Sequence, residues 1–216
     1  MESRRHSYGL VLALVIASTA FQLAVSATDG PRLVVITLQA ATLVVAVRTA
    51  RVHRAGVRLA ALAAALAVLA SLVIWIVGGN IPDATFAIVN GLLVAVAPAV
   101  LAAGLVSDLR TRGEVAIHTL AGVLAIYLLI GMFFSAAYGV VEAVDSDALF
   151  ADQTSSTPAD RLYFSFVTLS TVGYGDFSPG SDGARELAVA EMLIGQIYLV
   201  TIVSLIVANL RPRQPA

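Results

Sequence analysis

The chain of 216 residues contains no cysteine, so disulfide bonds and thiolate metal sites are excluded from its chemistry. Charged residues are also scarce, at 12% of the sequence against 59% that are hydrophobic. A soluble domain has about twice that share of charged residues. We therefore expect an integral membrane protein. The formal net charge of −1 gives no reason to expect a nucleic-acid partner.

No span or loop brings a nucleophile, a base and an acid together, so the sequence does not predict an enzyme. Only six residues follow Leu210. We therefore expect no cytoplasmic gating domain that binds a nucleotide, calcium or NAD.

Six apolar runs are long enough to cross about 30 Å of hydrocarbon, which takes roughly 20 helical residues. They lie near residues 9–27, 33–50, 58–79, 84–107, 115–141 and 185–210. The loops between the first five runs are short, so these helices should be antiparallel neighbours in a bundle.

The arginines orient the predicted spans, because short cytoplasmic loops are enriched in positive charge. Ten of the thirteen basic residues fall on one side, namely Arg4, Arg5, Arg48, Arg51, Arg54, Arg58, Arg110, Arg112, Arg211 and Arg213. The other three, Arg32, Arg161 and Arg185, fall on the opposite side among many acids. We expect a multi-pass protein of the cell membrane with both termini in the cytoplasm.

The first run also imitates a secretory signal, since Arg4 and Arg5 precede it and Val25-Ser26-Ala27 offers a small-residue cleavage site. Cleavage would leave five spans with the same orientation, so the arginines do not decide between the two cases. We favour an uncleaved span, because the run is long for a signal and its loss would remove one helix from a four-helix bundle.

The last two spans are separated by a longer polar insertion, residues 142–184, which contains Thr171-Val172-Gly173-Tyr174-Gly175-Asp176. Consecutive carbonyl oxygens point the same way only if successive residues alternate between opposite-handed backbone conformations, and glycine reaches positive φ without strain. Gly173 and Gly175 occupy alternate positions. The stretch can therefore stack carbonyl oxygens that replace the water shell of a cation, and the Thr171 hydroxyl can add an oxygen at the inner end.

The stretch from Tyr163 to Asp176 resembles the pore signature of tetrameric potassium channels. The resemblance implies K⁺ ions held by Thr171, Val172, Gly173, Tyr174 and Gly175, with Asp176 at the outer mouth. No organic cofactor is implied. The motif occurs once, so one chain does not enclose a pore and a homotetramer in the lipid bilayer is implied.

A short pore helix should precede the motif. Thr157 suits the N-cap, Pro158 the first helical position and Asp160 the third position after the cap, which is a variant capping box. The helix should run to about Ser170. Its carbonyl end then points at the inner end of the filter, where the helix dipole favours a cation.

Three aromatic residues of this helix, Tyr163, Phe164 and Phe166, are spaced to brace the outer wall of the filter. In the family, two tryptophans commonly occupy the positions of Tyr163 and Phe164, and this sequence departs from that pattern. Tyr163 can still reach Asp176 through its hydroxyl, whereas Phe164 has no donor. We expect weaker bracing of the filter than in the family.

The last span resembles the inner helix of these channels. Gly195 lies where the family often places a hinge glycine. A glycine inside a helix lowers the stability of the helix by about 1 kcal/mol relative to alanine, so its presence suggests either bending or close packing at this position. Leu199, Val203 and Val207, four residues apart, would line the inner pore and could narrow it.

Two titratable residues near the spans are candidates for function. Glu191 is the one carboxylate within an apolar span. Its expected partners are the hydroxyls of Thr168 or Ser170 behind the filter, or Gln196, and it either supports the filter or is a protonated structural group. His118, near the inner end of the fifth span, is more typical of an interfacial anchor than of a pH switch.

The spans divide into two units. Residues 1–108 match the four-helix voltage-sensor domain of six-span channels in number and size, and residues 109–216 form the pore domain. The family's fourth helix carries an arginine at every third position, whereas residues 84–107 contain no charged residue, and Pro98 predicts a kink there. Arg48, Arg51, Arg54 and Arg58 follow the second span at near-helical spacing. We interpret them as membrane anchors that contact lipid headgroups, in preference to a voltage sensor in a different position.

We therefore predict an all-α membrane protein with six transmembrane helices, a re-entrant pore helix and a selectivity-filter loop. It would be a homotetrameric, passive, potassium-selective channel that is insensitive to voltage. Two alternatives stay open: a non-conducting or regulatory channel subunit, and part of a potassium transporter, although such transporters carry four degenerate filter loops in one chain. The gating stimulus and any separate regulatory subunit are not predicted.

Overall fold

The computed structural model describes residues 2–24, 29–50, 52–78, 81–112, 117–145, 147–152 and 155–209. The helices are α1 (Glu2–Ala24), α2 (Asp29–Thr49), α3 (Arg54–Gly78), α4 (Asp83–Arg112), α5 (Ile117–Val144), α6 (Pro158–Leu169) and α7 (Asp182–Asn209). Each segment that was predicted to be helical is a helix, with ends that shift by several residues. Among the described residues the only β-pairing is an isolated bridge between Phe150 and Pro179.

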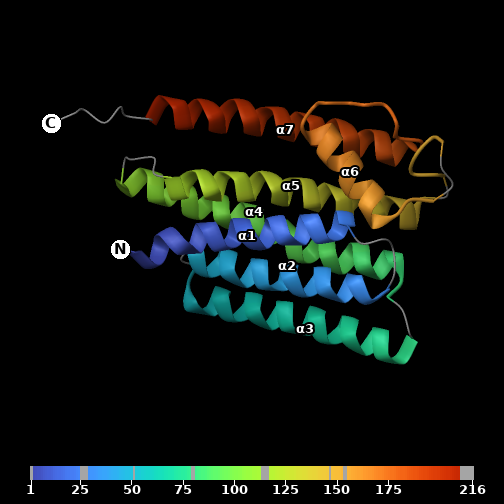
Figure 1. The fold of residues 1–216 in the computed structure, drawn as a ribbon, viewed down its shortest axis with the longest axis horizontal. Helices are drawn as coiled ribbons and strands as arrows, with labels where there is room; N and C mark the ends of the chain where they lie inside the picture. The colour runs from blue at the N-terminus through green and yellow to red at the C-terminus, as the bar shows by residue number, and fades with distance from the viewer. Residues whose placement is uncertain are drawn as a thin grey trace.

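The six long helices lie side by side and alternate in direction (Figure 1). α1 begins and α7 ends at one end of the bundle, where α2 also connects to α3, and the segments that flank α6 lie at the opposite end. The antiparallel neighbours expected from the short loops are confirmed for α1 with α2, α2 with α3 and α4 with α5. They are wrong for α3 and α4, which do not pack on each other in the described residues because α2 packs on both. α5 is central, since it packs against α1, α4, α6 and α7.

Four stretches in the described residues are long and apolar enough to cross a membrane, namely Arg32–Thr49, Arg54–Gly78, Asp83–Ser107 and Thr119–Val144. α1 contributes a shorter apolar stretch, Tyr8–Ala24, and α7 is not among the four. The chain is therefore an all-helical, multi-pass membrane protein. Bilayer crossing by α1 and α7 stays a prediction.

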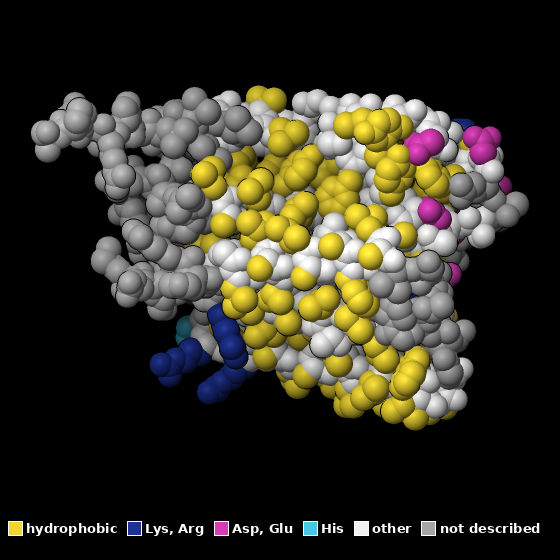
Figure 2. Space-filling view, viewed as in Figure 1, with side chains coloured by type: hydrophobic (Ala, Val, Ile, Leu, Met, Phe, Trp, Pro, Cys, Tyr) yellow, Lys and Arg dark blue, Asp and Glu magenta, His cyan; other side chains and the backbone are white. Residues whose placement is uncertain are grey.

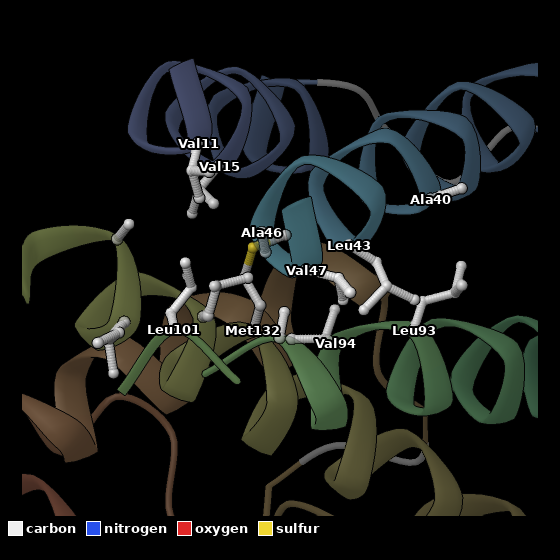
Figure 3. Close-up of a cluster of buried hydrophobic side chains, with 14 of the residues drawn as sticks. Val11, Val15, Ala40, Leu43, Ala46, Val47, Leu93, Val94, Leu101 and Met132 are labelled. Carbon is white, nitrogen blue, oxygen red and sulfur yellow. The ribbon is translucent and has the colours of Figure 1, made fainter. Parts of the chain in front are cut away.

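The main hydrophobic core lies where α1, α2, α4 and α5 meet (Figure 3). Its buried side chains include Val11, Val15, Leu43, Val47, Leu93, Val94, Leu101 and Met132. Because these residues come from both predicted units, the α1–α4 bundle packs on α5 of its own chain.

Charged side chains separate toward the two ends of the bundle. Figure 2 shows arginines beside the connection from α2 to α3 and carboxylates at the opposite end. Arg32 belongs to the acidic end, where it pairs with Asp83, donates to the Ile81 carbonyl and lies over the Phe86 ring. The separation supports the orientation expected from the sequence, which stays a prediction.

A buried ion pair ties the end of α5 to the start of α6. Arg161 is 2% exposed and donates to the Glu142 carboxylate and to the carbonyl and hydroxyl of Ser156, at 3.2 and 3.0 Å. Ser156 donates from its backbone N and its Oγ to the same carboxylate, at 2.7 and 2.6 Å. Glu142, the first residue of the predicted polar insertion, lies in the last turn of α5, and its charge is neutralised by Arg161.

Glu142→Ala should leave the Arg161 charge buried without a partner, which lowers the free energy of unfolding by about 3 kcal/mol. Thermal unfolding in detergent, followed by circular dichroism, measures the loss. Arg185→Ala is the control, because the Arg185–Asp182 pair is exposed and such pairs contribute about 0–1 kcal/mol. Equal midpoints for the two variants would contradict the structural role of the Glu142–Arg161 pair.

Candidate functional site

The short helix α6 positions the site, and its start matches the prediction. Thr157 Oγ1 accepts from the backbone N of Asp160 at 3.2 Å, and Asp160 Oδ2 accepts from the backbone N of Thr157 at 2.8 Å. Pro158 occupies the first turn and Ser170 is the C-cap. The capping box therefore sets where α6 begins, between α5 and α7 at the end of the bundle opposite the α2–α3 connection (Figure 1).

The chain turns sharply after α6. The backbone N of Thr171 donates to the Thr168 carbonyl, and the backbone N of Val172 donates to the Val167 carbonyl, each at 3.0 Å. These bonds hold the start of the loop against the carbonyl end of α6. We call residues 171–176 the filter loop.

The backbone of the filter loop alternates in handedness. φ is +60° at Thr171, +59° at Gly173 and +78° at Gly175, and it is not positive at Val172 or Tyr174 between them. The alternation expected at the two glycines is confirmed. The sequence did not predict the positive φ at Thr171, because β-branched residues rarely adopt positive φ. The alternation itself indicates it, since Thr171 lies two residues before Gly173.

One side of the filter loop is open. Residues 171–176 are all exposed, including the apolar side chains of Val172 and Tyr174, which are 52% and 70% exposed. A Cβ added at Gly173 or Gly175 would meet no atom within 4 Å. Within one chain, the glycines are therefore required by their φ angles and not by crowding.

Tyr163 braces the outer half of the loop. Its hydroxyl donates to Asp176 Oδ2 at 2.7 Å, as predicted, and its ring stacks with the Tyr174 ring at a centroid distance of 6.5 Å. The hydrogen bond to Asp176 is the main cause that raises the pKa of Tyr163 above its ordinary value.

Phe164 and Phe166 pack against α5 within one chain, whereas Tyr163 contacts the filter loop, so bracing by the two phenylalanines stays a prediction. Phe164 packs edge to face against Tyr138 of α5 and Phe150, each at 5.1 Å. Phe166 packs against Gly131 of α5. The reason is that α6 is inserted between α5 and α7, so residues on its different faces meet different helices.

Glu191 joins three helices behind the filter loop. It is 0% exposed, accepts from the Tyr138 hydroxyl of α5 at 2.7 Å and contacts Ser165 Oγ of α6. Ser165 Oγ is also 2.7 Å from the Gly131 carbonyl. We call Glu191, Ser165 and Tyr138 the carboxyl cluster.

The partners expected for Glu191 were wrong. Ser170 Oγ bonds back to the Phe166 carbonyl at 2.6 Å and lies at the exposed end of α6. Ser165 lies one turn before Thr168 on the face toward α5 and α7, so the helical period could have indicated it. Tyr138 comes from a distant helix and carried no local signal.

Gly195 lies against the end of α6. A Cβ added there would be 2.7 Å from the Leu169 carbonyl oxygen, and α7 continues as one helix through this position. These observations favour close packing over a hinge.

Leu199 of α7 is partly buried. The side chains of Val203, Val207, His118 and Arg51 lie outside the described residues.

α4 lacks charge along its central turns. Between Asp83 and Asp108 it carries no charged residue, and it continues as one helix through Pro98. Asn90 is buried, with an Oδ1 atom that has no hydrogen-bond partner.

Residues 122–211 match the family model described as "Ion channel". Two pore potassium channel a of Oryza sativa subsp. japonica is 34% identical over 91 residues, which is 42% of this chain and 24% of that protein. Potassium voltage-gated channel subfamily A member 6 of Homo sapiens is 36% identical over 89 residues, which is 41% of this chain and 16% of that protein. Protein LctB of Bacillus caldotenax is 36% identical over 85 residues, which is 36% of this chain and 62% of that protein.

The chain spans a quarter or less of the length of the rice and human channels. No solved structure gives a significant match. The matched region contains α6, the filter loop and the carboxyl cluster. Residues 122–211 are therefore similar to an ion-channel domain and to parts of potassium channels.

Proposed function

We propose that four copies of this chain form a potassium-selective channel, with the filter loops facing one axis. K⁺ is bound by oxygens of Thr171, Val172, Gly173, Tyr174 and Gly175, and Asp176 lies at the outer mouth. The observation that carries the proposal is the alternating backbone from Thr171 to Gly175. Alternation turns successive carbonyl oxygens to one side, and four such ladders replace the water shell of a cation.

Uncovered apolar surface supports assembly into a ring. Val172 and Tyr174 are exposed within one chain, as are Met192, Leu193 and Ile197 on α7. One chain carries one filter loop, and closed rotational symmetry brings identical loops to a common axis. In the tetramer, neighbouring copies cover part of this surface.

The surroundings of the loop suit a cation. The carbonyl end of α6 meets the inner end of the filter loop, where the partial negative charge of the helix dipole stabilises a cation that has lost water. Tyr163 and Asp176 hold the outer end, and the carboxyl cluster holds α6 in place. K⁺ passes without a coupled reaction.

Gly173→Ala should abolish K⁺ conduction or its selectivity, because a residue with a Cβ at this φ is strained by about 1–2 kcal/mol in each chain. The measurement is K⁺-driven flux into liposomes that contain the purified protein, with Na⁺ as the comparison ion.

Gly91→Ala is the matched control, since its Cβ would meet only Ala136 at an ordinary 3.5 Å. Equal Na⁺ and K⁺ flux in the unmodified protein would contradict the proposal. Flux that appears only when another channel subunit is added would favour a regulatory subunit.

The carboxyl cluster has more acceptors than protons if Glu191 is ionised. Ser165 Oγ lies near both the Gly131 carbonyl and Glu191, but a hydroxyl has one proton to donate. We infer that Glu191 is a neutral acid that donates to Ser165 Oγ, while Ser165 donates to Gly131 and Tyr138 donates to Glu191. Every polar atom of the cluster then has a partner.

Glu191→Gln should therefore conduct and unfold like the unmodified protein, because an amide can donate to Ser165 and accept from Tyr138. Glu191→Ala should lower stability by about 1–3 kcal/mol for each hydroxyl left unpaired and should reduce K⁺ flux. Tetramer melting on gels and liposome flux measure both effects. An amide variant as damaged as Glu191→Ala would show that the charge is needed.

Conductance should depend little on voltage. A charge that crosses the whole field contributes about 2.3 kcal/mol per 100 mV, and α4 offers no charge between Asp83 and Asp108. Arg48, Arg54 and Arg58 lie near helix ends. A conductance–voltage curve in symmetric potassium should be nearly flat. A steep curve made shallower by Arg48→Gln would show that the sensor lies in the α2–α3 connection.

A further inference from the structure

An apolar cleft of about 600 Å³ opens between α3 and α4. α2 forms its floor, because α2 packs on both of these helices, whereas α3 and α4 make no comparable contact in the described residues. Apart from Leu59, the residues that line the cleft from α3 are small, and those from α4 are branched. Gly56, Ala60, Ala63 and Ala67 face the cleft from α3, and Leu92, Val96 and Val100 from α4. The described chain leaves the cleft unfilled.

The cleft has the length of one lipid leaflet. Its lining on α3 runs from Gly56 to Ala67, roughly 17 Å at 1.5 Å per residue. Half of a hydrocarbon core of about 30 Å is about 15 Å. The cleft therefore matches the depth of an acyl chain that starts at the end where α2 connects to α3.

Three arginines surround that end. Arg48 follows Val47 of the lining, and Arg54 and Arg58 lie on either side of Gly56 in the sequence. All three are exposed, and among the described residues none forms an ion pair. The described carboxylates gather toward the opposite end of the bundle (Figure 2). An anion at the mouth of the cleft would therefore meet positive charge.

We propose that this cleft binds an anionic phospholipid, with one acyl chain between α3 and α4 and the phosphate on Arg48, Arg54 and Arg58. With the orientation predicted above, the lipid comes from the cytoplasmic leaflet. The inference concerns the α1–α4 bundle and does not depend on potassium conduction.

The two parts of the site have different roles. Lipid tails are as apolar as the cleft, so filling it restores van der Waals contacts without selecting a headgroup. Selection comes from the arginines, each of which favours an anionic lipid by roughly fivefold. The site therefore needs both a tail and a negative headgroup.

Native mass spectrometry of the purified full-length protein in detergent tests this. Phosphatidylglycerol should be retained, up to one molecule per chain, and phosphatidylcholine with the same acyl chains should not. Replacing the three arginines by glutamine should reduce retention of phosphatidylglycerol by roughly fivefold for each arginine, to the level of phosphatidylcholine. Arg185→Gln, an exposed arginine at the other end, should have no effect.

Ala63→Phe fills the cleft and leaves the arginines, so it should also abolish retention. Ala70→Phe is the matched control, because Ala70 is exposed on α3 and does not line the cleft. Ala67→Leu adds a smaller side chain to the cleft. It replaces Ala63→Phe in the test if Ala63→Phe lowers the unfolding midpoint of the lipid-free protein. Retention unaffected by both filling variants, equal retention of the two lipids, or full competition by tail-less glycerol phosphate would each overturn the proposal.

Discussion

The constraint on which the structure depends is that non-helical backbone at membrane depth must be enclosed by protein or face water. In the proposed channel the filter loop is such a backbone, and it follows a helix of only 12 residues. α5 and α7 enclose α6 from two sides, while the capping box, the Arg161–Glu142 pair and the carboxyl cluster hold it at its start and middle. The long helices thus enclose the short helix α6 and fix the position from which the filter loop starts.

The two predicted units contribute differently to this enclosure. The α1–α4 bundle contributes α1 and α4 to the packing on α5, and α2 reaches the shared core, whereas α3 packs mainly on α2. The charged side chains described for this bundle lie near helix ends, so it packs on α5 without presenting charge to the membrane interior.

Local patterns predicted most of the fold and part of the site. Helix number followed from run length, the start of α6 from Thr157, Pro158 and Asp160, and the backbone of the loop from the spacing of Gly173 and Gly175. The Tyr163–Asp176 bond was within reach because both residues flank the same short segment. What failed was partner choice across helices: Tyr138 meets Glu191 through packing that no sequence spacing encodes. The open side of α3 was hidden for the same reason, since a uniformly apolar helix does not show which face lacks a neighbour.

One chain by itself supplies several bonds that shape the filter loop. Val172 donates to Val167, Tyr163 donates to Asp176, and Arg161 pairs with a carboxylate only 19 residues earlier. In the proposed tetramer, each subunit is therefore preorganised: little backbone is left to order, so the entropy lost on association is smaller than for a loop that folds only at the axis. Burial of the exposed Val172 and Tyr174 then favours association of subunits whose loops are already shaped.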